Sequence, residues 1–196
     1  TFQGVFAIDH MIHLLKRNPN NVSGSYIFNT QPSKKSGEHW ICVIIHNDTA
    51  YYFDSFGRHP KYFPGLAHAL ALRCKVIEWN DCLLQNTSST LCGDYCIIFV
   101  LLHSRGWSLQ KFVDWLYSLG NSEQRDHLLR KLTLTMYGSS TLSSYRNYSF
   151  ALSGLDNIHL ETIVTAQNKT CTEMWIVFTP ERSGGVLMIT RVCNNA

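Results

Sequence analysis

The chain has 196 residues, of which 45% are hydrophobic and 12% aromatic, and its formal net charge is +3. This composition indicates one packed domain with at most a small appendage, rather than a disordered chain. No apolar run approaches the roughly 20 residues that cross a bilayer, and the weak positive charge does not argue for a nucleic-acid-binding protein. The seven cysteines are odd in number, and most lie in or beside apolar runs, which favours buried thiols in a reducing, intracellular compartment.

The first half of the chain alternates between helix-like and strand-like patterns. Residues 5–16 carry apolar side chains at helical spacing and predict a helix that ends before Asn18-Pro19. Strands are expected at 25–29, 39–45, 50–53 and 74–79, and a further helix at 63–72. The turn at 46–49 joins the second and third of these strands into a hairpin.

The second half begins with helices. Residues 92–104 are apolar nearly all round and predict a central buried helix. Further helices are expected at 108–119, where Ser108 is the N-cap, and at 122–136; from about residue 140 the pattern becomes strand-like. The sequence therefore predicts an α+β fold, with a small, mostly antiparallel sheet packed against helices. It also predicts a domain at 1–139 and a β-rich extension at 140–196.

Cys92 is the strongest single signal of function. It begins the predicted helix at 92–104, after a polar loop and directly before Gly93. The N-terminus of a helix presents unpaired N–H groups and a partial positive charge, which favour a thiolate over a thiol. Alone, a cysteine beside an apolar run is more often a buried structural residue. Cys92 predicts a nucleophile only in combination with a base and an acceptor.

His39 and Asp54 supply these two groups. A thiol nucleophile needs a base within hydrogen-bonding reach, and the base needs an orienting acceptor on its other nitrogen. His39 opens one strand of the expected hairpin and Asp54 follows the other, so the hairpin brings the carboxylate close to the imidazole. The combination predicts His39, Asp54 and Cys92 as a catalytic triad.

Gln85 lies seven residues before Cys92, in the polar loop 85–91. If the loop folds back, the carboxamide points at the carbonyl oxygen that the Cys92 N–H would hold, which makes Gln85 a candidate oxyanion donor. Alone, a loop glutamine is more often solvated. Metal binding competes for the cysteines, but they lack the short paired spacing of zinc ligands, so no metal is predicted.

These residues stand in motifs that resemble the adenovirus protease family, which is related to the SUMO and Nedd8 isopeptidases. The matching motifs are Gly37-Glu38-His39-Trp40, Phe53-Asp54-Ser55-Phe56-Gly57, Gln85 and Cys92-Gly93-x-x-Cys96. The resemblance covers about residues 20–137. Adenoviral members carry Glu at the acid position and the isopeptidases carry Asp, so Asp54 fits the chemistry. Residues 140–196 depart from the family, which continues helical there.

The resemblance implies a cysteine endopeptidase that cuts viral precursor proteins, often after small Gly-containing sequences, in the host nucleus or the virion. It implies that Cys74, eighteen residues before Cys92 as in the family, forms a disulfide with a short activating peptide. Otherwise Cys74 is a buried strand cysteine. No cofactor is required for the chemistry, and DNA, which the family can use, has only weak support from the charge of +3. Two alternatives stay open: an isopeptidase for ubiquitin-like proteins and an inactive protease-fold binding module.

Overall fold

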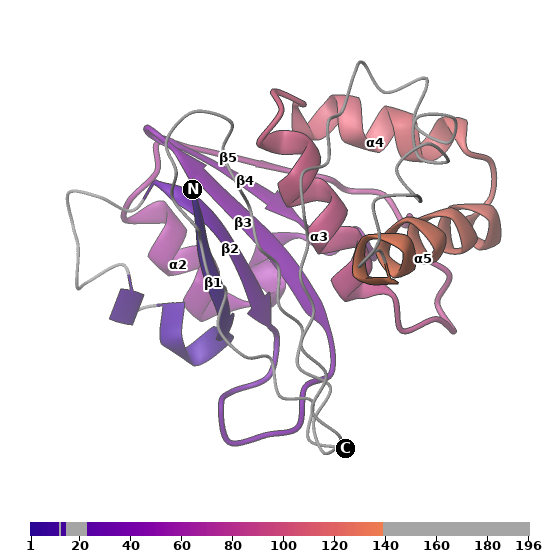
Figure 1. Cartoon of the computed structure of the whole chain (residues 1–196). Coiled ribbons are helices and arrows are strands. Elements are labelled where there is room, and N and C mark those ends of the chain that lie inside the picture. The colour runs from indigo at the N-terminus through magenta and orange to yellow at the C-terminus, as the bar shows by residue number, and fades with distance from the viewer. Residues whose placement is uncertain (12, 15–22, 139–196) are drawn as a thin grey trace. The chain divides into compact units, whose positions relative to one another are not determined.

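The computed structural model describes residues 1–11, 13–14 and 23–138 (Figure 1). The predicted β-rich extension, and the boundary predicted at residue 139, lie outside these residues and stay predictions. The chain divides into two compact units, and the first includes Thr1–Arg130 with every predicted site residue. The predicted α+β class is confirmed for the part of the chain that the structure describes.

Five strands form one sheet whose spatial order follows the chain order. The strands are β1 (Phe2–Ala7), β2 (Gly24–Asn29), β3 (Trp40–His46), β4 (Thr49–Phe53) and β5 (Val76–Trp79). The helices are η1 (Ile8–His10), η2 (Pro60–Tyr62), α2 (Pro64–Ala71), α3 (Cys92–His103), α4 (Leu109–Ser118) and α5 (Ser122–Gly138). Of the helices described, none has the length and apolar character that a membrane span requires.

The sheet is mixed, so the prediction of a mostly antiparallel sheet is wrong. β2, β3 and β4 pair antiparallel, but both outer strands, β1 and β5, pair parallel with their neighbours. A parallel neighbour requires a crossover connection, which η2 and α2 provide between β4 and β5. A hairpin can be recognised from local sequence, whereas parallel pairing depends on where the chain returns after the crossover.

The helix predicted at residues 5–16 is wrong over its first turn. Phe2–Ala7 forms strand β1, which pairs with β2 so that Val5 lies opposite Ile27. The ring of Phe6 then packs against Phe28 with 6.0 Å between the ring centroids. Pairing with β2 outweighs the helical spacing of the apolar residues, because helix propensity is weak compared with tertiary contacts.

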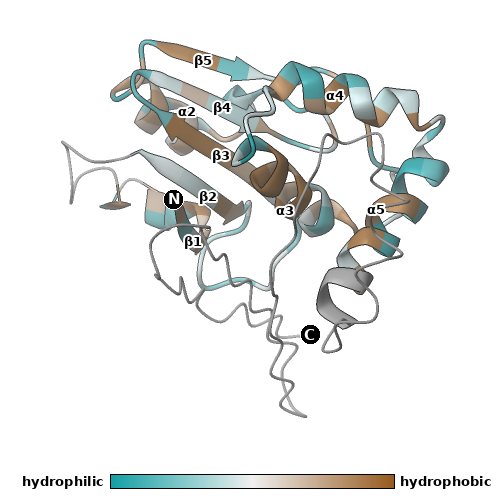
Figure 2. Cartoon of the chain, turned by 45° about the horizontal axis from the view of Figure 1, so that its top comes forward, coloured by the Kyte–Doolittle hydropathy of each residue, from teal (hydrophilic) through white to brown (hydrophobic). Residues whose placement is uncertain are grey.

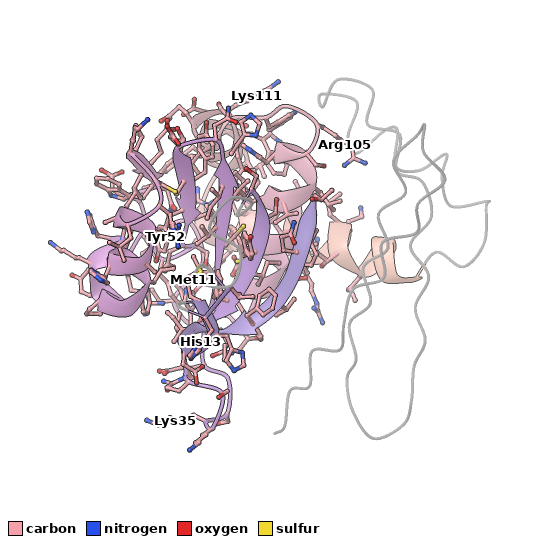
Figure 3. The ribbon with its side chains drawn as sticks, turned by 90° about the vertical axis from the view of Figure 1, so that its left-hand side faces the viewer. Met11, His13, Lys35, Tyr52, Arg105 and Lys111 are labelled. Atoms are coloured by element: carbon pink, nitrogen blue, oxygen red, sulfur yellow. The ribbon has the colours of Figure 1, made fainter. Side chains whose placement is uncertain are left out.

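Both faces of the sheet are covered by helices (Figure 1). On one face, Ile41, Tyr52 and Met11 belong to a core cluster that includes residues of α2; Figure 3 labels Met11 and Tyr52 among the packed side chains. On the other face, Phe53 packs against Phe99 of α3, with 5.2 Å between the ring centroids. Figure 2 shows the hydrophobic colour concentrated on β3 and α3. The sheet is therefore packed on both faces beneath the strand ends that carry the predicted site.

Candidate active site

The β3–β4 hairpin brings His39 and Asp54 together. Its register pairs Cys42 with Phe53, which places the residues before β3 beside those after β4. His39 Nε2 lies 2.8 Å from Asp54 Oδ1, and both side chains are buried. The carbonyl oxygen of His39 also accepts a hydrogen bond from the N–H of Thr30, at 2.8 Å. The imidazole is therefore carried by a backbone segment at the start of β3, and β3 pairs with β2 on one side and with β4 on the other.

Cys92 approaches the same imidazole from helix α3. Its side chain interacts with the imidazole closely enough to raise the pKa of His39, and because Nε2 contacts Asp54, Nδ1 is the nitrogen left for the sulfur. The helix begins at Cys92, as predicted, and no side chain caps its first turn. His39 thus lies between an acid and a thiol that are 38 residues apart in the chain.

The surroundings change the pKa values of His39 and Asp54 in opposite directions. Burial alone would lower the pKa of His39, but the hydrogen bond and charge of Asp54, together with the interaction with Cys92, outweigh burial and raise this pKa. Burial alone would raise the pKa of Asp54, but the hydrogen bond and charge of His39, with the Phe56 N–H and Arg58, lower it. The pair therefore favours an ionised carboxylate beside an imidazole that readily holds a proton.

The Asp54 carboxylate has four hydrogen-bond donors around it. Oδ1 accepts from His39 and from the N–H of Phe56, each at 2.8 Å. Oδ2 accepts from Arg58 Nε at 2.9 Å and, at 3.4 Å, from the hydroxyl of Tyr52. The ring of Phe56 also stacks on the His39 ring, with 4.7 Å between centroids and 17° between planes. These contacts fix the rotamers of both the acid and the base.

Asn80 holds the backbone of Asp54, a role that the sequence did not predict. Its Oδ1 accepts from the N–H of Asp54 at 3.0 Å, and its Nδ2 donates to the Asp54 carbonyl at 2.7 Å. Asn80 follows β5, whose parallel pairing with β4 brings both strand ends to one edge of the sheet. Recognising that pairing is the signal that could have identified Asn80.

Gln85 is fully buried beside the Asp54–Ser55 turn. Its Oε1 accepts from the Ser55 hydroxyl at 2.7 Å, and its Nε2 donates to the carbonyl and the hydroxyl of Ser89 at 2.8 and 2.9 Å. Among the described residues these are its side-chain hydrogen bonds, and neither His39 nor Cys92 shares in them. The carboxamide is thus oriented by serines on both sides, and its donor end faces Ser89.

Helix α5 holds the residue that precedes Gln85, and α5 is itself hydrogen-bonded to helix α3. The Leu84 carbonyl accepts from Arg125 Nε at 2.8 Å. Asp126, also on α5, accepts from the Tyr95 hydroxyl at 2.8 Å, and the Tyr95 side chain is fully buried. This buried network joins the Gln85 loop to the helix that begins at Cys92, so the loop and the thiol share one support.

Gly57 closes the turn after Asp54 in a conformation that favours glycine. Its φ is +69°, its N–H donates to the Asp54 carbonyl at 2.8 Å, and an added Cβ would lie 2.6 Å from the backbone carbonyl carbon of Cys82. Gly106 is a matched control, because its φ is +86° but nothing lies within 4 Å of its Cβ position.

We expect Gly106→Ala to lower the free energy of unfolding by about 1–2 kcal/mol through its left-handed backbone alone. Gly57→Ala should lower it by clearly more, because the backbone of Cys82 must also move. Urea unfolding of the two variants measures the difference. Equal losses would show that the close approach to Cys82 has no energetic weight.

Cys74 is not on a strand, because β5 begins at Val76 rather than at residue 74 as predicted. Its side chain is buried in the core cluster that contains Leu70, and burial raises the pKa of its thiol. A disulfide to a peptide would require this thiol to become exposed.

The described residues contain no group of three His, Cys, Asp or Glu side chains that could hold a metal ion.

No protein-family model matches the chain, and no curated protein matches it. Function is therefore inferred from the geometry of the site and from the sequence motifs.

Proposed function

We propose that the protein is a cysteine endopeptidase whose nucleophile is Cys92. The observation that carries the proposal is the position of His39, which is buried, hydrogen-bonded to Asp54 and close enough to Cys92 for the two side chains to interact. A nucleophile, a base and an orienting acid in this order are the parts that thiol-dependent acyl transfer needs.

In the proposed reaction, His39 takes the thiol proton as the Cys92 sulfur attacks the scissile carbonyl. The tetrahedral intermediate collapses when the amide C–N bond breaks and the His39 imidazolium returns the proton to the leaving amine. A water molecule, deprotonated by His39, then attacks the thioester and releases the acid product. Asp54 stabilises the imidazolium in both halves, since its carboxylate stays ionised.

The oxyanion of each intermediate is proposed to bind the backbone N–H of Cys92, at the free N-terminus of α3, and Nε2 of Gln85. Nε2 donates to the Ser89 carbonyl and hydroxyl, so one of its hydrogens has to turn from Ser89 to the substrate. The oxyanion is charged and therefore competes well against a neutral hydroxyl acceptor, because charge-assisted hydrogen bonds are about twice as strong.

The proposed substrates are viral precursor proteins cut after Gly-containing sequences, as the motifs around His39 and Cys92 imply. Gly93 supports a close approach of the substrate. A Cβ at Gly93 would make only an ordinary 3.6 Å contact with the Trp40 ring, so the packing of the protein itself does not require glycine there. The disulfide of Cys74 with an activating peptide is a further part of the proposal, and full activity of Cys74→Ser without any peptide would end it.

The direct test is cleavage of two substrates by wild type and by Cys92→Ala. One is a Gly-containing peptide of the viral-precursor type; the other is a ubiquitin-like protein fused through its C-terminus. Mass spectrometry identifies the products. Cleavage of the first by wild type alone supports the endopeptidase. Cleavage of the second alone favours the isopeptidase, and cleavage of neither, with no thiol-probe labelling, favours an inactive binding module.

Gly93→Ala separates the fold from the substrate. We expect its free energy of unfolding to stay the same or rise by up to about 1 kcal/mol, since alanine is the better helix former. Its kcat/KM should fall, because the added methyl narrows the approach beside Cys92. Thermal unfolding and peptide cleavage measure the two effects. Unchanged kcat/KM would mean that the substrate does not pass Gly93.

A further inference from the structure

Arg58 contacts the side of Asp54 that His39 leaves free. Its Nε lies 2.9 Å from Asp54 Oδ2, while His39 lies 2.8 Å from Oδ1. The Arg58 guanidinium also lies over the Phe56 ring, at 5.5 Å, and that ring stacks on His39. A cation, a carboxylate, an imidazole and one aromatic ring therefore form a closed cluster.

A second aromatic contact holds the guanidinium in place. Arg58 lies 5.4 Å from the centre of the Phe63 ring, just before helix α2. Contacts with two aromatic faces favour a cation and fix its direction. The Arg58 side chain is 37% exposed while Asp54 is fully buried, so the arginine stands between the buried acid and the solvent.

The titratable groups around Asp54 come from four elements. His39 faces it from the start of β3, Tyr52 from β4 and Arg58 from the loop after β4; on α3, Cys92 contacts His39 and Cys96 lies close enough to interact with the Asp54 charge. Burial raises the pKa of Tyr52 and of Cys96 far above neutral pH. Of these groups, Arg58 alone carries a permanent positive charge.

We propose that Arg58 is a positioning residue that holds the Asp54 carboxylate for His39 and moderates how strongly His39 binds a proton. It acts through Asp54 and does not touch the substrate. The inference rests on the proposed function for its meaning, since it sets the pH range in which His39 can exchange protons with Cys92 and the leaving amine.

The sign of the effect follows from the charges. Asp54 stabilises the protonated form of His39, and Arg58 opposes this because its own charge partly neutralises the carboxylate. Without the Arg58 charge, protonated His39 is the remaining cation among these groups that contacts the carboxylate. The pKa of His39 then rises, and the limb of the pH–rate profile that reports His39 moves to higher pH.

The experiment is NMR titration of the His39 imidazole in the full chain, for wild type, Arg58→Gln, Arg58→Lys and Lys61→Gln. Arg58→Gln removes the charge and keeps a donor, whereas Arg58→Lys keeps the charge. Lys61 is exposed in the same connection, so Lys61→Gln is a matched loss of one charge. Arg58→Met is a second neutral variant should Arg58→Gln fold poorly.

We expect the His39 midpoint to rise in the neutral Arg58 variants by more than in Lys61→Gln, and Arg58→Lys to restore most of the wild-type value. An unchanged midpoint in a folded neutral variant, or a shift no larger than that of Lys61→Gln, would overturn the proposal. The titration needs no substrate. A shifted midpoint in a protein that cleaves nothing would therefore refute the proposed function and keep the role of Arg58.

Discussion

Replacement of Cys92 by alanine is expected to abolish peptidase activity, with a loss on the order of 10⁶ in kcat, as when another peptidase loses its nucleophile. Among the described residues, Cys92 is the thiol that interacts with His39, so its loss removes the group proposed to carry the acyl intermediate. The fold should survive, because the side chain loses only a sulfur and Cys92 makes no cap at the start of α3. The cost should resemble that of small core truncations, about 0.5–1.5 kcal/mol. Peptide cleavage and urea unfolding measure both quantities.

Cys96→Ala is the matched control for this variant. Cys96 lies one turn further along α3 and is fully buried. Its replacement by alanine removes a buried sulfur from the same helix and keeps the proposed nucleophile. We expect Cys96→Ala to be less stable and still active. An active Cys92→Ala would show that Cys92 is not the nucleophile. A Cys96→Ala that folds and is equally inactive would assign the loss to packing of α3 instead of chemistry.

Replacement of Gln85 by alanine is expected to lower kcat by about 10²–10³ and to change KM less. Its Nε2 is proposed to stabilise the oxyanion, which develops only in the transition state. Steady-state kinetics on a peptide substrate measures the two parameters separately. A change confined to KM would show that Gln85 binds substrate and takes no part in the oxyanion hole.

Gln85 also anchors its own loop, so a structural role has to be separated from a chemical one. Ser89→Ala removes one of the two Ser89 acceptors of Nε2 and leaves the other, the carbonyl at 2.8 Å. We expect Ser89→Ala to retain kcat within about tenfold, since the donor itself remains. A loss of kcat in Ser89→Ala as large as in Gln85→Ala would mean that loop order, and not the Gln85 donor, controls the rate.

The parts of the site that the sequence predicts are those fixed by local structure. The hairpin turn at His46–Thr49 sets the register that joins His39 to Asp54, and the apolar run after Cys92 identifies the start of α3. The polar sequence of the Gln85 loop indicates an exposed loop, yet Gln85 is fully buried, because serines on both sides satisfy its carboxamide.

What the sequence could not predict depends on distant pairing and on rotamers. The strands β1 and β5 are parallel to their neighbours, so local sequence patterns do not show where they lie in the sheet. Because the position of β5 could not be predicted, the contact of Asn80 with Asp54 could not be predicted either. Arg58 stands only four residues after Asp54. Its role requires the turn at Gly57 to fold the chain back on the carboxylate, which a sequence alone does not show.

The central claim is that His39 activates the Cys92 thiol, and the rate of alkylation of each cysteine tests it most directly. Native wild type and His39→Ala are treated with limiting iodoacetamide near neutral pH, and modified peptides are identified by mass spectrometry over time. We predict that Cys92 of wild type reacts much faster than Cys42 and Cys96, whose pKa values are raised by burial. His39→Ala should slow the reaction of Cys92 alone. A Cys92 that reacts no faster than Cys42, or equally fast without His39, would contradict the claim.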